Sequence, residues 1–157
     1  MFITDEKDHE YRFGDSGPKY LMKGPRMNFA LVQFLPGQDF KAHLHNVMEE
    51  NFYIIEGEID IVVDGVVHHL TAGQFIHIEP HETHYCINNY DKPVKMVSTL
   101  APYQEVDKVE IDNYTYWFGY TPLTLCFFLK ASYREQLFAV PGSLLLAYFC
   151  QSMYLVC

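Results

Sequence analysis

The chain has 157 residues, enough for one domain with a hydrophobic core. It carries 20 Asp and Glu against 11 Lys and Arg, so its formal net charge at pH 7 is −9. Because an acidic surface repels phosphate groups, we expect no nucleic-acid partner. The first residues lack the apolar run of a secretory signal peptide, and no CxxC pair occurs. These features predict a cytoplasmic protein.

Residues 1–26 are predicted to form an irregular N-terminal arm, because Gly14, Gly17-Pro18 and Gly24-Pro25 interrupt them. Residues 27–34 then resemble a β-strand, which ends at the turn Pro36-Gly37. Further short β-type runs follow at close intervals: 39–45, 50–56, 58–63, 66–70, 74–79, 83–88 and 94–100.

Asp64-Gly65, between Val63 and Val66, is typical of a two-residue type I′ hairpin turn. No helical periodicity of convincing length precedes residue 120. Many short strands joined by tight turns predict an all-β sandwich or barrel, which we place at residues 27–118.

The C-terminal tail, residues 119–157, differs in composition from the rest of the chain. Residues 136–157 contain no charged side chain. This tail would be a packed element on the barrel or in a dimer, a membrane anchor, or an extension appended to a finished domain. The anchor is the least favoured of the three, because Pro141-Gly142 interrupts the apolar run and leaves 15 residues after it.

A metal site is indicated by the spacing of three histidines and one carboxylate. His43 and His45 would lie on the same face of a strand, roughly 6.5–7 Å apart along the backbone. Glu50 follows on the next predicted strand, and His84 lies on a later one. Three imidazoles and a carboxylate suit one divalent transition metal, namely Mn, Fe, Co, Ni or Zn.

The spacing of these residues resembles the sequence motifs of the cupin superfamily, in particular of its small single-domain members. The segment Gly37-x5-His43-x-His45-x4-Glu50-x6-Gly57 matches the first cupin motif in full. The second motif, Gly-x5-Pro-x-Gly-x2-His-x3-Asn, is matched by Gly73, His84 and Asn88. The chain departs from it at Glu79, where proline is usual, and at His81, where glycine is usual.

This resemblance implies an antiparallel jelly-roll β-barrel and a homodimer. It also implies that the metal ligands are His43, His45, Glu50 and His84. Four protein ligands leave two positions of a six-coordinate ion for substrate or water, which is typical of a catalytic site. His81 is interpreted as a turn residue, since histidine tolerates the left-handed region better than most residues.

Strand parity predicts part of the pocket around these ligands. Phe52 shares the parity of Glu50, and Cys86 that of His84, so both should line the cavity. Phe40 and Met48 would close its mouth. A carboxylate substrate would require a cation, and the candidates are Lys41 and Arg26. The side chains proposed for proton transfer are Glu82, His81 and Tyr85, with Glu79 as a further candidate.

Two classes of function remain open. The first is an enzyme acting on a small polar molecule, such as a sugar, a sugar acid or another carboxylic acid. Isomerase, lyase or decarboxylase chemistry is slightly favoured over an O₂-dependent dioxygenase, although the family spans all of these reactions. The second is a non-enzymatic module that binds a metal or a small ligand. An enzyme needs an acid or base near the substrate, and a binding module does not.

Overall fold

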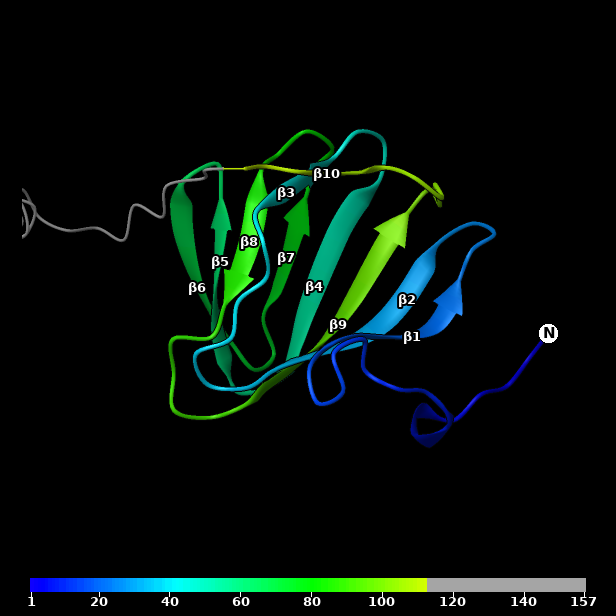
Figure 1. Cartoon of the computed structure of the whole chain (residues 1–157), viewed down its shortest axis with the longest axis horizontal. Helices are drawn as coiled ribbons and strands as arrows, with labels where there is room; N and C mark the ends of the chain where they lie inside the picture. Colours follow the sequence, from blue (N-terminus) through cyan, green and yellow to red (C-terminus); the bar gives the residue numbers. More distant parts are fainter. Residues whose placement is uncertain (113–157) are drawn as a thin grey trace, which may run out of the picture. The chain divides into compact units, whose positions relative to one another are not determined.

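The computed structural model describes residues 1–112 (Figure 1). The predicted tail at 119–157 and the end of the predicted domain therefore lie outside the described residues. Within residues 1–112 the fold is all-β, apart from one 3₁₀ turn, η1 (Glu6–Asp8). Ten strands form two five-stranded antiparallel sheets.

The first sheet has the order β1 (Gly17–Lys23), β2 (Asn28–Phe34), β9 (Val94–Ala101), β4 (Glu49–Glu56) and β7 (Phe75–Ile78). The second has the order β10 (Lys108–Glu110), β3 (His43–His45), β8 (His84–Ile87), β5 (Glu58–Val63) and β6 (Val66–Thr71). From β3 to β10 the chain passes from one sheet to the other at every connection except the β5–β6 hairpin. This is the jelly-roll arrangement that the sequence predicted.

Every predicted strand is present, and most strand boundaries differ from the prediction by a few residues. The main difference concerns one edge strand in each sheet, β1 in the first and β10 in the second. β1 lies inside the predicted irregular arm and pairs with β2, so the first sheet begins at Gly17. Its Gly17-Pro18 start resembles a turn, yet proline is tolerated at the start of an edge strand. β10 has three residues and pairs with β3 alone, too short a run for periodicity to reveal.

The hairpin at Asp64-Gly65 forms as predicted. Val63 pairs with Val66, and the two turn residues have φ of 47° and 82°. Positive φ at both positions is the signature of a type I′ turn.

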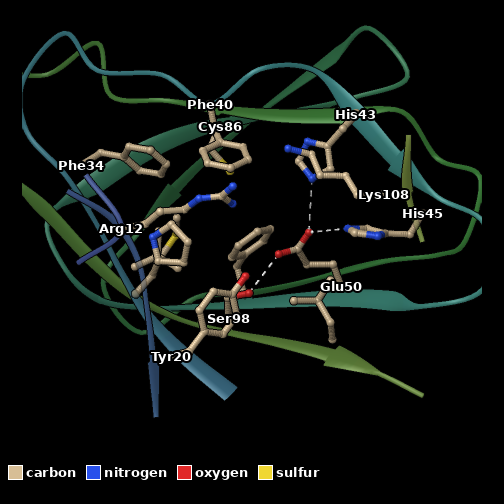
Figure 2. A pocket seen from close by; sticks show the side chains of 15 residues that line it. Arg12, Tyr20, Phe34, Phe40, His43, His45, Glu50, Cys86, Ser98 and Lys108 are labelled. Atoms are coloured by element: carbon tan, nitrogen blue, oxygen red, sulfur yellow. Dashed lines mark hydrogen bonds and ion pairs between the residues drawn. The ribbon is translucent and has the colours of Figure 1, made fainter. Parts of the chain in front are cut away.

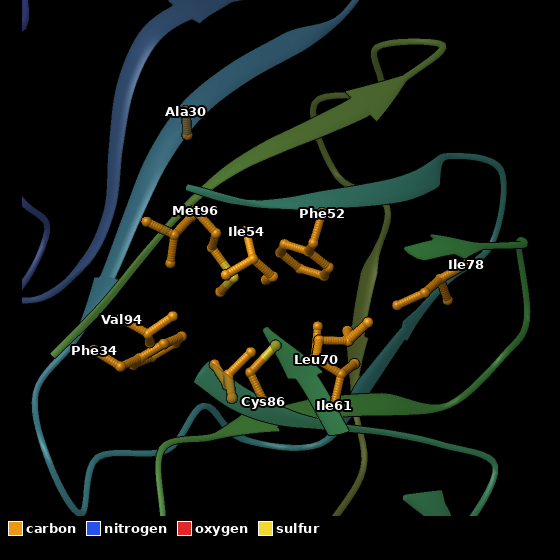
Figure 3. Packing of buried hydrophobic residues seen from close by; sticks show 12 residues of the cluster. Ala30, Phe34, Phe52, Ile54, Ile61, Leu70, Ile78, Cys86, Val94 and Met96 are labelled. Atoms are coloured by element: carbon orange, nitrogen blue, oxygen red, sulfur yellow. The ribbon is translucent and has the colours of Figure 1, made fainter. Parts of the chain in front are cut away.

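The core lies between the sheets and draws on both of them (Figure 3). Phe52, Ile54 and Met96 come from the first sheet, while Ile61 and Cys86 come from the second. Alternate residues of β9 are buried, as the period of two requires. One end of this interior is polar, and there the predicted metal-binding residues gather.

Candidate metal centre

Three strands from two sheets bring the predicted ligands together. His43 and His45 lie on β3, Glu50 is the second residue of β4, and His84 is the first of β8. His43 and His84 are cross-strand partners. Because β3 alternates its faces, both of its histidines point inward and are buried, while Leu44 between them is half-buried.

The four side chains meet at one carboxylate oxygen. Glu50 Oε2 lies 3.6 Å from Nε2 of His43, 3.3 Å from Nε2 of His45 and 3.1 Å from Nε2 of His84. One ligand atom from each residue lies within 4.8 Å of all the others. Figure 2 shows the imidazoles of His43 and His45 turned towards the Glu50 carboxylate. The structure thus gathers the predicted set into one buried cluster.

Backbone carbonyls set the orientation of two of the rings. His43 Nδ1 lies 2.9 Å from the carbonyl oxygen of Lys41, and His84 Nδ1 lies 2.9 Å from that of Glu82. A carbonyl can only accept, so Nδ1 carries the proton in each neutral ring. In the neutral ring Nε2 presents its lone pair to the centre of the cluster, which is the tautomer that a metal ligand needs. Although burial lowers the pKa of His84, Glu50 raises it overall, so the protonated ring donates from Nε2 to Glu50 Oε2 at 3.1 Å, where a metal would replace that proton.

His45 is held differently, by a carboxylate. Its Nδ1 lies 3.5 Å from Oδ2 of Asp107, which is 5% exposed. The Asp107 carboxylate accepts backbone N–H bonds from Val47 and Met48 at 2.9–3.3 Å. Sequence reasoning missed Asp107, because nothing in the motif spacing connects positions 45 and 107.

Both ring nitrogens of His45 are buried without a hydrogen-bond partner among the described residues. Buried polar atoms are normally satisfied, so an orphaned imidazole nitrogen facing a carboxylate requires an explanation. A cation at the centre of the cluster would satisfy His45 Nε2 together with Glu50. The residues present therefore fit a divalent transition metal.

The charge of Glu50 suits this role. Burial alone would raise the pKa of Glu50, but the three histidines hold it well below its usual range. The Ser98 hydroxyl donates to Glu50 Oε1 at 2.9 Å, which leaves Oε2 to face the histidines. Burial lowers the pKa of His43, and this favours the neutral, ligating form of its imidazole.

Beside the cluster lies a cavity of about 80 Å³ (Figure 2). Phe52 and Cys86 line it, as parity predicted, and so does Phe40, whereas Met48 is buried away from it. The burial of Cys86 and the nearby Glu50 charge raise the pKa of its thiol, so Cys86 is a packing residue. Most of the remaining wall is apolar: Pro18, Val32, Phe34, Met96 and Leu100.

The two cationic residues predicted to bind a substrate carboxylate do not line the cavity. Lys41 is an exposed residue paired with Glu110 and Asp112 at 3.0 and 2.9 Å, and Arg26 does not line the cavity. Two other cationic side chains line the cavity: Arg12 from the N-terminal arm and Lys108 from β10. No sequence signal identifies them, because both depend on how the arm and the edge strand fold back.

The side chains proposed for proton transfer do not line this cavity. Glu82 accepts a hydrogen bond from the backbone N–H of Glu79 at 2.8 Å, within the turn before β8. His81 is exposed with φ of 72°, the predicted turn residue, and its backbone N–H donates to the His45 carbonyl at 2.7 Å. Tyr85 is buried in a separate cluster with Ala42 and Val62.

Comparison with known proteins agrees with the fold. A family model described as the cupin domain matches residues 30–100. The chain therefore carries a cupin domain, and the histidine–glutamate cluster lies within the matched residues. Over 76 residues the chain is 33% identical to the protein named polyketide synthase CurC from Streptomyces cyaneus. That stretch is 48% of each protein, so the chain spans about half the length of this curated relative.

Solved structures show the same fold. A double-stranded β-helix protein from Klebsiella pneumoniae has a TM-score of 0.62 and 21% identity, covering 71% of this chain and 99% of its own. TT1209 from Thermus thermophilus has a TM-score of 0.58 and 26% identity, covering 66% and 100%. An RmlC-like cupin from Shewanella frigidimarina has a TM-score of 0.59 and 23% identity, covering 67% and 94%.

Within residues 1–112, no helix has the length and apolar character needed to span a membrane.

Proposed function

We propose that this protein is a metal-dependent enzyme acting on a small organic molecule. The observation that carries the proposal is the buried His45 imidazole, whose ring nitrogens lack hydrogen-bond partners while Nε2 faces the Glu50 carboxylate at 3.3 Å. His43, His45, Glu50 and His84 would hold one divalent ion. Such an ion, when bound, acts as a Lewis acid towards a hydroxyl, carbonyl or carboxylate oxygen.

The protein's own residues prepare this site in three ways. The Lys41 and Glu82 carbonyls hold two imidazoles in the ligating tautomer. The Ser98 hydroxyl holds one oxygen of the Glu50 carboxylate. The apolar wall of the cavity limits water around a bound substrate, and this strengthens every electrostatic interaction there. Isomerase, lyase or decarboxylase chemistry is our first proposal, and dioxygenase chemistry uses the same ligands.

A non-enzymatic binding module is the second candidate. It is favoured by the position of Glu82, His81 and Tyr85, none of which lines the cavity. A role for these three in proton transfer stays a prediction of the sequence. The hydroxyl groups that do line the cavity belong to Tyr20 and Ser98. The homodimer and the cytoplasmic location also stay predictions.

Metal analysis tests the proposal. Full-length protein would be purified without added metal, and elemental analysis would compare the wild type with His45→Ala and His77→Ala. His77 is an exposed histidine bonded to Asn51, so its variant controls for loss of any histidine. We expect about one equivalent in the wild type and in His77→Ala, and a loss of at least tenfold in His45→Ala.

Iron would favour oxidative assays, whereas zinc, nickel or manganese would favour isomerase and lyase assays. If the wild type holds no metal and takes up none of Mn, Fe, Co, Ni or Zn on titration, the metalloenzyme proposal is rejected.

A further inference from the structure

Two cationic side chains point into the cavity beside the metal centre, in a chain with a net charge of −9. In Figure 2 the Arg12 side chain extends into the pocket, and Lys108 lies beside the histidines. Glu50 is the single carboxylate in the cavity wall formed by the described residues, and the three histidines surround it. Arg12 and Lys108 thus make the rest of the cavity electropositive, against the charge of the molecule as a whole.

Arg12 is held in place by the turn that precedes β1. Its backbone N–H donates to the Pro18 carbonyl at 3.0 Å, and Tyr11 forms a β-bridge with Gly14. The next residue, Phe13, packs its ring 6.4 Å from that of Phe40 at the cavity wall. Arg12 is an exposed residue whose guanidinium carbon lies 5.6 Å from the centre of the Phe13 ring. Among residues 1–112 it has no ion pair or hydrogen bond from its guanidinium, so its N–H donors are available to a ligand.

Lys108 reaches the same wall from the other side. It is paired with His45 in the β10–β3 ladder, and its ammonium lies 4.4 Å from the centre of the Phe40 ring. Its contact with Glu110 at 3.2 Å is shared, because the other oxygen of Glu110 pairs with Lys41. The Phe40 ring thus packs near both Lys108 and Phe13, and it lies 5.5 Å from the ring of His43.

The remainder of the cavity is unsuited to a polyol. Its other walls are aromatic, aliphatic or sulfur-containing side chains, with the hydroxyls of Tyr20 and Ser98 as the neutral polar groups. The Ser98 hydroxyl is already engaged with Glu50. Sugar hydroxyls buried there would lose their hydrogen bonds to water without replacement, at a cost in affinity. A volume of about 80 Å³ also suits a small ligand.

We propose that the ligand of this cavity is a small organic acid with an apolar carbon chain, whose carboxylate is bound by Arg12 and Lys108. Arginine matches a carboxylate with two parallel N–H donors, and lysine adds a point charge. The inference deepens the proposed function, because it names the substrate class of the same site. Among the candidate substrates suggested by the sequence, it favours a less hydroxylated acid over the sugars.

An NMR titration tests this with ¹⁵N-labelled full-length protein, both metal-free and loaded with Zn²⁺. The probes are butyrate, its uncharged isostere butyramide, and the hydroxylated acid glycerate. We expect saturable shifts with butyrate around Phe40 and β10, and at least tenfold weaker binding of butyramide and glycerate. Arg12→Gln and Lys108→Gln should each weaken butyrate binding about tenfold, and Arg12→Lys should restore part of it.

Lys7→Gln and Arg26→Gln are matched controls, because they remove cations that lie outside the cavity and do not pair with a partner of Lys108. Butyrate binding unchanged in Arg12→Gln and Lys108→Gln, or equally weakened in the controls, would overturn the inference. So would tighter binding of glycerate, or no butyrate binding by protein that is folded and holds zinc. Butyrate binding by protein that takes up no metal would support the inference and reject the proposed metal chemistry, so the two failures are distinguishable.

Discussion

At the scale of single residues, the contacts behind the imidazoles distinguish the three histidines. His43 and His84 are oriented by backbone carbonyls, which no substitution removes. His45 relies on the side chain of Asp107, a residue 62 positions away in sequence that is itself fixed by two backbone N–H groups. The geometry of the centre is therefore most sensitive to mutation through Asp107.

Asp107→Asn should weaken metal binding by roughly tenfold, since partners of metal-ligating histidines typically contribute 10–100-fold. The asparagine keeps an oxygen for the backbone N–H groups but loses the charge that holds the His45 ring. A chelator competition titration measures the affinity. Asp112→Asn, which alters an exposed partner of Lys41, is the matched control and should bind as the wild type. Equal affinity in both variants would show that Asp107 does not position His45.

At the scale of elements, the site depends on the crossings between sheets. Gly57 joins β4, which carries Glu50, to β5 of the other sheet. Its φ is 81°, and a Cβ atom there would lie 2.5 Å from the Pro93 carbonyl oxygen and 2.9 Å from Val94 Cα. Since the obstacles are backbone atoms, no side-chain rotation relieves them.

Gly57→Ala should therefore destabilise the fold more than the same change at another positive-φ glycine. Gly65, with φ of 82° and nothing within 4 Å of a Cβ, is the matched control. Left-handed strain alone costs about 1–2 kcal/mol in Gly65→Ala, and the clash should add at least about 1 kcal/mol in Gly57→Ala. Urea denaturation measures both free energies of unfolding. Equal losses would mean that the strands shift apart at little cost.

At the scale of the whole molecule, residues 1–112 are stabilised by a core that both sheets share, and the metal centre lies at the polar end of the same interior. The four predicted ligands, all of them buried, come from β3, β4 and β8. Unfolding separates these strands, so the proposed metal binding would be thermodynamically linked to folding.

Zn²⁺ should accordingly raise the midpoint of thermal unfolding of the full-length protein. A free metal concentration one hundred times Kd adds about 2.7 kcal/mol, which corresponds to roughly 10 °C for a domain of this size. Differential scanning fluorimetry measures the shift, and EDTA should reverse it. His45→Ala should show less than a third of the effect. A wild type indifferent to Zn²⁺, Mn²⁺, Co²⁺ and Ni²⁺ alike would contradict the linkage.

The sequence by itself determined the strands β2 to β9, the Asp64-Gly65 hairpin and the four predicted ligands that gather at the centre. These features are local: side-chain alternation has a period of two, the turn requires two positive φ angles, and a motif with fixed spacing places its histidines on strand faces. For the same reason Phe52 and Cys86 were correctly assigned to the cavity.

Only the tertiary structure decided what surrounds that centre. Asp107, Arg12 and Lys108 reach the site from the loop before β10, the N-terminal arm and a three-residue edge strand, and no local pattern relates their positions to His43 or His45. Lys41 has the predicted parity, but Glu110 and Asp112 hold it at the surface. Contacts between distant segments follow from how the two sheets pack, and the spacing of residues in the sequence does not predict that packing.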